Sequence, residues 1–240
     1  MTDTVGGTIV AMGGGGFSME PDNPLLDDFV LDLARSARGR DRPRVCFVPT
    51  ASGDADGYVA RFYEAFARRS EASHLALFNR TVVDLERFLL EQDVVYVGGG
   101  NTANLLAVWR THGVDRLLAR AWSEGTVLTG LSAGSICWFE GGTTDSFGPL
   151  AALRGGLALL PGSHSPHYDS EPERRPTYHR LIADGSLPDG HAADDGAALV
   201  FRGTELVEVV ASRPKARAYR VSHGPDAAVV ETELATRYLG

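Results

Sequence analysis

The sequence has few cysteines and no long hydrophobic run. Its two cysteines, Cys46 and Cys137, both lie in apolar stretches of a 240-residue chain, which argues against a disulfide scaffold and for a reducing compartment. No apolar run approaches the ~20 residues that a membrane-spanning helix needs. The segment 1–16 also lacks the charged and apolar regions of a signal peptide. These absences predict a cytoplasmic protein with no membrane partner.

Basic residues are scarce relative to acidic ones. The chain carries 23 Lys and Arg against 31 Asp and Glu, which gives a net charge of −8. Nucleic acids and anionic membranes bind through basic surfaces, because much of the affinity comes from counterion release. The charge balance therefore argues against either partner. No repeat or linker divides the sequence, so we expect residues 1–240 to form a single α/β domain.

Short β-prone runs alternate with amphipathic helical patterns through the first 130 residues. The expected buried strands are 8–12, 45–48, 75–78, 94–97 and 127–129, and the expected helices are 25–37, 58–66, 84–90 and 102–122. This alternation predicts right-handed βαβ crossovers and a mainly parallel, doubly wound sheet, whose ligand site lies at the carboxyl ends of the strands. Four later runs predict an antiparallel C-terminal extension at the sheet edge: 197–201, 206–210, 216–221 and 227–230.

The most informative motif is Gly130-Leu131-Ser132-Ala133-Gly134, which follows the apolar run 127–129. The G-x-S-x-G pattern is typical of a nucleophile elbow, in which a sharp strand-to-helix turn strains the serine backbone and small neighbours avoid a clash. Ser132 would then be exposed at a strand end, and the amide of Ala133 would point at a developing oxyanion. A glycine-rich turn with no catalytic role fits the same pattern, so the interpretation depends on the rest of the chain.

Two other glycine-rich stretches follow predicted strands. Gly98-Gly99-Gly100 precedes an apolar helix, and an amide from this loop, Gly99 by preference, could join Ala133 in an oxyanion hole. A helix-capping turn is the alternative reading, and it is compatible with catalysis. The run 13–16 lacks the Lys-Ser/Thr of a phosphate-binding loop, which favours a close backbone approach to a neighbouring loop. We therefore predict no cofactor.

A serine nucleophile needs a base, and two of the seven histidines lie in a suitable place. His164 and His167 fall in the segment 163–169, just after the apolar run 157–160. Loops at strand ends are where a parallel sheet collects catalytic groups. The two histidines have no companion acids or thiols in a recognisable ligand pattern, which argues against a metal site.

Together these motifs resemble the peptidase E family of serine peptidases, whose relatives include cyanophycinase. The matching segments are YVGGGNT at 96–102, GLSAG at 130–134 and Pro-His-Tyr at 166–168, in the order of the family. The resemblance implies a flavodoxin-like or class I glutamine amidotransferase-like sheet. It also implies Ser132 as the nucleophile and His167 as the general base, with oxyanion amides from Gly99 and Ala133.

The third member of the catalytic triad is less well defined. It must orient the imidazole and stabilise its charge, which is a task for a carboxylate. The family places an acid shortly after the elbow helix, where Asp145 fits best and Glu140 is a close alternative. A role as an ordinary turn residue is equally compatible with the position of Asp145.

Substrate preference is read from two adjacent arginines. Peptidase E cleaves dipeptides with an N-terminal aspartate, and an arginine fork suits a substrate carboxylate. Arg174 or Arg175 lies where the family has an arginine after the catalytic histidine. In the alternative reading, both arginines are exposed and paired with Glu171 and Glu173, which leaves nothing for a ligand.

Three functions are compatible with these residues. The resemblance implies a cofactor-independent serine exopeptidase that acts on short peptides with an acidic first residue. The alternatives are a cyanophycinase-like hydrolase of another aspartyl amide and a non-catalytic binding module on the same fold. Both a monomer and a homodimer are compatible with the sequence.

Overall fold

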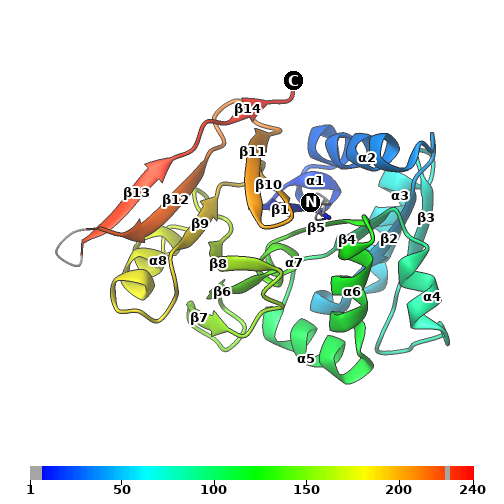
Figure 1. Cartoon of the computed structure of the whole chain (residues 1–240), viewed down its shortest axis with the longest axis horizontal. Helices are drawn as coiled ribbons and strands as arrows, with labels where there is room; N and C mark the ends of the chain where they lie inside the picture. Colours follow the sequence, from blue (N-terminus) through cyan, green and yellow to red (C-terminus); the bar gives the residue numbers. More distant parts are fainter. Residues whose placement is uncertain (1–6, 225–227) are drawn as a thin grey trace, which may run out of the picture.

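Two β-sheets organise the chain in the computed structural model, which describes residues 7–224 and 228–240 (Figure 1). The eight strands of the first sheet are β1 (Thr8–Met12), β2 (Arg44–Val48), β3 (Glu71–His74), β4 (Val94–Val97), β5 (Val127–Leu131), β10 (Ala197–Arg202), β11 (Glu205–Ala211) and β14 (Arg237–Tyr238). The six strands of the second are β6 (Phe139–Thr144), β7 (Ala151–Arg154), β8 (Leu160–Ser165), β9 (Gly190–Ala193), β12 (Ala218–His223) and β13 (Val229–Glu233).

The helices occupy the connections between these strands. They are α1 (Gly16–Met19), α2 (Leu25–Arg38), the 3-10 helix η1 (Thr50–Ser52), α3 (Asp56–Phe66), α4 (Leu85–Leu90), α5 (Thr102–His112), α6 (Val114–Ser123), α7 (Ala133–Ile136) and α8 (Arg174–Ala183). None of the helices in the described ranges is both long and apolar enough to cross a membrane.

The first sheet is mainly parallel, as the alternating pattern predicts. Its strands run in the order β14-β11-β10-β1-β5-β4-β2-β3, and every neighbouring pair from β1 to β3 is parallel. β4 and β5 are buried along their whole length, because helices cover both faces of this sheet. Figure 1 shows α2 and α5 on opposite sides of these strands. The α/β fold with a largely parallel sheet is confirmed.

The strand order follows the flavodoxin pattern only in part. The order β3-β2-β4-β5 corresponds to the first four places of the flavodoxin-like order 2-1-3-4-5. The fifth place is taken by β1, which comes from the N-terminal end of the chain. The antiparallel strands β10 and β11 then extend the sheet beyond β1, where the sequence predicts an extension.

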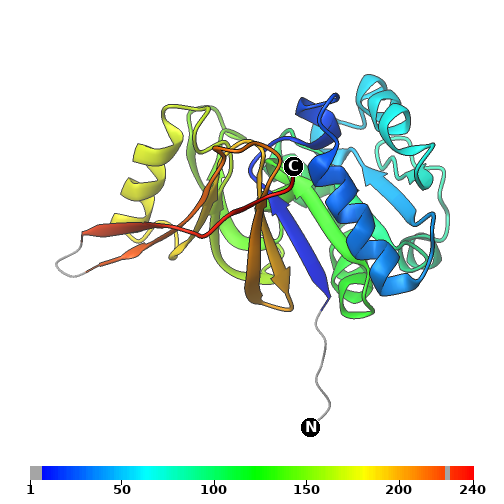
Figure 2. The same cartoon turned by 90° about the horizontal axis from the view of Figure 1, so that it is seen from above.

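The second sheet is not anticipated by the sequence pattern. It runs in the order β13-β12-β9-β8-β6-β7, with β6, β8 and β9 parallel and the outer strands antiparallel. Two of the runs expected at the edge of the first sheet belong here, as β12 and β13. Figure 2 shows this sheet beside the first one, with α8 packed on its outer face. Residues 1–6 and 225–227 lie outside the described residues, and with them parts of the predicted N-terminal segment and of the run 227–230.

One predicted strand is wrong in position. The apolar run 75–78 was expected to form a strand, but β3 ends at His74. The side chains of Leu75 and Leu77 are buried in the core cluster that also contains Leu105 and Trp109 of α5. Their hydrophobicity therefore reflects packing in a loop, while β3, at the sheet edge, needs fewer apolar residues.

Candidate active site

Ser132 occupies a sharp turn between β5 and α7. Its backbone has φ 55° and ψ −118°, a conformation that residues with a side chain rarely adopt. A Cβ atom on Gly130 would overlap the carbonyl of Gly134, and one on Gly134 would overlap the carbonyl of Val97. The turn can therefore form only with small residues at both positions. Ser132 itself stays partly exposed at the carboxyl end of the sheet.

The glycine loop after β4 lies directly beside Ser132. A Cβ on Gly99 would lie 3.4 Å from the Cβ of Ser132. Asn101 caps α5 by accepting a hydrogen bond from the amide of Asn104 at 2.8 Å, so the capping role is real. The loop thus begins a helix and faces the serine at the same time, because β4 and β5 are parallel neighbours.

The backbone N–H groups of this loop differ in their hydrogen-bond acceptors. Gly98 N–H donates to the carbonyl of Val48 at 3.2 Å, and Asn101 N–H donates to that of Ala51 at 2.8 Å. Gly99 N–H, the expected oxyanion donor, donates to the hydroxyl of Tyr58 at 3.2 Å. Within the described residues, the Gly100 and Ala133 N–H groups have no acceptor. These two amides, rather than that of Gly99, are free to bind a ligand.

His167 forms a hydrogen-bonded pair with Asp195. Its Nδ1 lies 2.7 Å from Asp195 Oδ1, and the two side chains are 12% and 6% exposed. Burial opposes ionisation of Asp195, but hydrogen bonds from His167 and Ser170, together with the electrostatic effect of His167 and Arg213, lower the pKa of that carboxyl. The Asp195 amide in turn donates to Asp169 Oδ1 at 2.8 Å, which anchors the loop that carries it. Asp195 is therefore held as a carboxylate facing the imidazole.

The first glycine loop lies against this pair. Gly13 O accepts from the amide of His167 at 3.2 Å, and Gly14 O accepts from that of Gly196 at 3.0 Å. A Cβ on Gly14 would overlap Asp195 Oδ1 and would lie 3.1 Å from His167 Cε1. The interpretation of this run as a close backbone approach is confirmed, and the glycines leave room for the histidine and the aspartate.

The structure corrects the expected acid. Asp145 is exposed in the turn after β6, where its carbonyl accepts from the amide of Gly148. Glu140 is exposed near the start of β6. β6 is parallel to β8, so Glu140 lies at the end of the second sheet opposite to His167, which follows the carboxyl end of β8. Asp195 takes the position at the imidazole because β9, which precedes it, is the parallel neighbour of β8.

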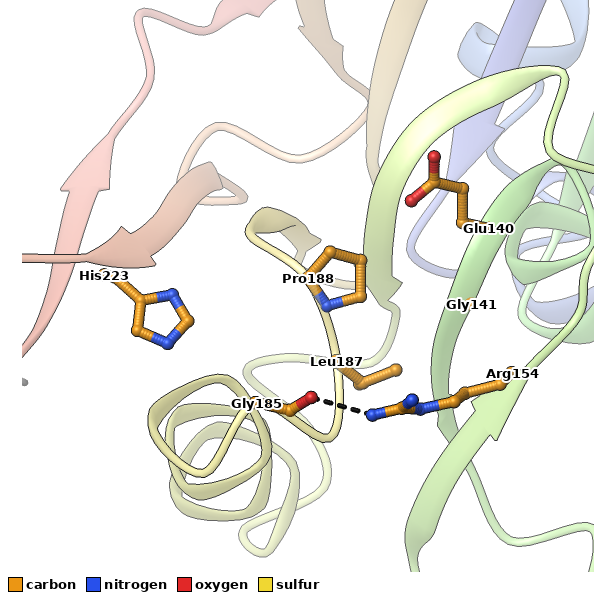
Figure 3. Close-up of a pocket in the computed structure, with 7 residues that line it drawn as sticks. All are labelled: Glu140, Gly141, Arg154, Gly185, Leu187, Pro188 and His223. Carbon is orange, nitrogen blue, oxygen red and sulfur yellow. Dashed lines mark hydrogen bonds between the residues drawn. The ribbon is translucent and has the colours of Figure 1, made fainter.

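Glu140 faces a separate cavity of about 460 Å³ at that opposite end (Figure 3). The residues that line it come from β6, β7, the segment after α8 and the end of β12: Glu140, Gly141, Arg154, Gly185, Leu187, Pro188 and His223. Arg154 donates to the carbonyls of Ser186 and Gly185, both at 2.7 Å, which ties β7 to the end of α8. This cavity has no part in the site at Ser132.

The two candidate histidines have different environments. His164 is fully buried, its ring is stacked on Phe139 with centroids 5.0 Å apart, and its Nδ1 lies 3.1 Å from the carbonyl of His191. Burial lowers the pKa of His164 to about 3, so its ring is neutral at physiological pH. It is a core residue, and His167 is the one of the two that has a carboxylate partner.

The two arginines diverge as well. Arg174 is 3% exposed; its guanidinium donates to the carbonyl of Thr143 at 2.8 Å and to Glu171 Oε2 at 2.6 Å. Arg175 lies over the rings of Tyr168 and Tyr219, 4.7 and 4.8 Å from their centroids. Its nearest carboxylate is that of Glu231 at 3.4 Å.

These contacts place the arginines differently relative to His167. Thr143, which Arg174 contacts, also shares a hydrogen bond of 2.8 Å with Ser165 Oγ at the end of β8, two residues before His167. Arg174 therefore lies by the carboxyl ends of β6 and β8. Arg175 lies on the side of β12 and β13, where it pairs with Glu231 rather than with Glu173.

A strained serine, two free amides and a histidine–carboxylate pair at the carboxyl ends of parallel strands define the class of α/β serine hydrolases. The comparisons narrow this class. The chain belongs to peptidase family S51, whose model matches residues 9–209. It is a serine-type peptidase of the peptidase E family.

The relatives agree with this assignment. The chain is 52% identical over 233 residues to the uncharacterized peptidase YgaJ of Bacillus subtilis, with 97% of this chain and 99% of that protein covered. It is 26% identical over 197 residues to the uncharacterized peptidase Lmo0363 of Listeria monocytogenes, with coverage of 77% and 91%. Among solved structures, a peptidase from an acI-B1 actinobacterium has a TM-score of 0.73 at 18% identity, with coverage of 97% and 96%, and it shares the fold.

Proposed function

We propose that this protein is an exopeptidase that hydrolyses short peptides through an acyl-enzyme on Ser132. The observation that carries the proposal is the 2.7 Å hydrogen bond between His167 Nδ1 and Asp195 Oδ1. This pair lies against Gly13 and Gly14 at the end of β1, which is the strand next to β5 and the strained turn of Ser132. That turn is a nucleophile elbow, and His167 is the general base. Asp195 takes the role first expected of Asp145 or Glu140.

The roles follow from the proton positions. Asp195 is acceptor-only when ionised, so His167 carries its proton on Nδ1 and leaves Nε2 free to accept one. Nε2 takes the proton of Ser132 as Oγ attacks the substrate carbonyl, and later gives it to the leaving amine. A water molecule, activated by the same nitrogen, then hydrolyses the ester and regenerates the serine.

The negative charge of the tetrahedral intermediate needs two donors. Ala133 N–H lies at the start of α7, directly after the nucleophile, and Gly100 N–H is the unengaged amide of the neighbouring glycine loop. We assign the oxyanion hole to these two groups in place of the pair Ala133 and Gly99. Donors that are already oriented cost no reorganisation when charge develops.

For substrate selection we favour Arg174 over Arg175. Arg174 lies by the strand ends that precede His167, whereas Arg175 is occupied by two tyrosine rings and Glu231. The guanidinium of Arg174 is buried and is already paired with Glu171, whose side chain is about half exposed. The aspartate side chain of a substrate would therefore replace Glu171 as its partner. The preferred substrates are therefore aspartyl dipeptides. The proposal covers residues 1–240 as one cytoplasmic catalytic domain, because both sheets contribute to the site, and it holds for a monomer or a homodimer.

The test is a kcat/KM comparison of matched Asp-Leu, Asn-Leu and Ala-Leu dipeptides with the parent protein. We expect the aspartyl peptide to exceed the asparaginyl one by at least ~100-fold, about 2.7 kcal/mol. Equal rates for the three peptides would remove the aspartyl preference and leave a less selective peptidase. Activity confined to a branched aspartyl-arginine polymer would instead indicate a cyanophycinase-like hydrolase, and no turnover of any amide would indicate a binding module.

A further inference from the structure

Tyr58, on α3, is a residue that the catalytic roles above do not use. It is 7% exposed, and its ring packs against those of Phe47 and Phe17, with centroids 4.9 and 5.6 Å away. The guanidinium of Arg61 covers the ring at 5.1 Å from its centroid. The ring is therefore fixed from several sides, and its hydroxyl reaches the glycine loop beside Ser132.

That hydroxyl holds the middle of the loop. Gly98 and Asn101 are anchored to the carbonyls of Val48 at the end of β2 and of Ala51 in η1, and Gly99 N–H donates to Tyr58 Oη at 3.2 Å. Among the described residues, Tyr58 supplies the one side-chain acceptor for the amides of Gly98, Gly99 and Gly100. A Cβ on Gly98 would lie 2.9 Å from Tyr58 Cε1, so the loop and the ring are in close contact.

Three successive glycines make such an anchor necessary. Glycine has no Cβ to restrict its dihedral angles, so the peptide planes of this loop can rotate unless an outside group holds them. The Tyr58 hydrogen bond fixes the Gly98–Gly99 peptide, and the bond from Asn101 N–H to the carbonyl of Ala51 fixes the Gly100–Asn101 peptide. The Gly99–Gly100 peptide, which carries the Gly100 N–H, is therefore held from both sides. Gly100 has φ 137°, and a Cβ there would overlap the carbonyl of Ala51, so only glycine fits at this position.

We propose that Tyr58 is a positioning residue that orients the Gly98–Gly100 loop so that the Gly100 amide faces the oxyanion. The inference rests on the proposed function of Ser132 and of the Gly100 amide. Burial raises the pKa of Tyr58, and the Ser18 side chain and the Gly99 amide oppose it only in part, so the hydroxyl is neutral at physiological pH. Tyr58 therefore acts as a fixed acceptor and not as an acid or base.

The experiment measures labelling by a fluorophosphonate, which does not depend on peptide specificity. Ser132 Oγ attacks phosphorus, its proton passes to His167, fluoride leaves, and the phosphoryl oxygen occupies the oxyanion hole. We expect Tyr58→Phe to slow labelling and to lower kcat by about 10- to 100-fold. A misplaced oxyanion-hole donor reduces the rate almost as much as a missing one. KM should stay within about threefold, and the pH profile should keep its shape.

Tyr63→Phe is the matched control. Tyr63 lies on the same helix, but its hydroxyl pairs with His74 Nδ1 at 2.9 Å, away from the glycine loop. Loss of this hydroxyl should leave the labelling rate unchanged. Rates are referred to the folded fraction, measured by circular dichroism. Affinity for a peptide aldehyde, whose adduct carries an oxyanion, should fall in Tyr58→Phe more than affinity for the product peptide.

The outcomes distinguish a failure of the positioning role of Tyr58 from a failure of the proposed peptidase function. Labelling and kcat of Tyr58→Phe within about twofold of the parent, or equal slowing in Tyr63→Phe, would overturn the positioning role and leave the peptidase mechanism intact. A changed pH profile in Tyr58→Phe would also overturn it, because the hydroxyl would then take part in proton transfer. A parent protein that is not labelled at Ser132 would instead overturn the proposed function itself.

Discussion

The two sheets contribute different parts of the candidate site. The eight-stranded sheet supplies Ser132 at the end of β5 and the glycine loop at the end of β4. Each of these is a short strand–turn–helix segment that a glycine-rich motif marks in the sequence. The six-stranded sheet supplies His167 and Asp195 after β8 and β9, and these two residues are 28 positions apart in the chain.

Ser132 and His167 are held in position by different kinds of contact. Ser132 is held by local backbone strain and by glycines at either side, which also leave room for the carbonyl of Val97 in the neighbouring strand. His167 is held by contacts to distant segments, namely the carboxylate of Asp195 and the carbonyl of Gly13. The carboxyl ends of the two sheets meet, and the site there combines the turn of Ser132 with the His167–Asp195 pair.

The largest effect is expected for the nucleophile on the first sheet. Ser132→Ala should fold normally and lose turnover by on the order of a million-fold, as removal of the nucleophile from a serine triad typically does. The measurement is single-turnover hydrolysis of the best dipeptide, with thermal unfolding to verify the fold. Hydrolysis within tenfold of the parent, about 1.4 kcal/mol, would mean that Ser132 is not the nucleophile.

The acid on the second sheet should give the next largest effect. Asp195→Asn keeps the shape of the side chain but offers His167 no charge and favours the wrong tautomer, so kcat should fall by about 10⁴-fold. Asp145→Asn is the matched control, because Asp145 is exposed in the turn after β6 and is expected to have no effect. Measurement of kcat for the two variants decides whether Asp195 or Asp145 is the acid of the triad. The reverse pattern would restore Asp145 to the triad.

A smaller effect should distinguish the two arginines. Replacement of Arg174 by Met should lower the Asp-Leu to Asn-Leu ratio of kcat/KM by up to ~100-fold, because the substrate carboxylate loses its partner. Arg175→Met should leave this ratio unchanged, since Arg175 is engaged by Tyr168, Tyr219 and Glu231. A ratio that survives in both variants would exclude either arginine as the reader of the acidic side chain.

The smallest effect concerns stability and the second histidine of the six-stranded sheet. Burial lowers the pKa of His164 from 6.5 to about 3, so below pH 6.5 the unfolded state binds one more proton than the folded state. This group's contribution to stability is complete above pH 6.5 and is lost as the pH falls towards 3. At pH 5 the loss is about 2 kcal/mol.

His164→Asn should remove the contribution of His164 to the pH dependence of the free energy of unfolding. The contributions of other groups in the molecule should remain. The difference between the free energies of unfolding at pH 7.5 and pH 5 should be about 2 kcal/mol smaller in the variant than in the parent. Urea unfolding at the two pH values measures it. The same difference in both proteins would show that the ring of His164 is protonated, or accessible to protons, in the folded state.

Sequence patterns predicted those strands, helices and turns whose form depends mainly on neighbouring residues. The helical spacing and the β-prone runs identified the parallel strands of the first sheet except the edge strand β3, because each buried strand between amphipathic helices must be apolar. The small residues around Ser132 indicated the strained turn for a similar reason, since only small neighbours permit it. The Pro-His-Tyr segment gave His167 through its resemblance to the peptidase E family.

The tertiary structure decided what no short segment contains. Asp195 follows β9, and it meets His167 only because β8 and β9 are parallel neighbours, a pairing that the sequence does not display. The hydroxyl of Tyr58 and the free amide of Gly100 are likewise settled by contacts between separate elements. Backbone strain and hydrophobic periodicity are set by neighbouring residues, whereas the choice of hydrogen-bond partner depends on which strands pair.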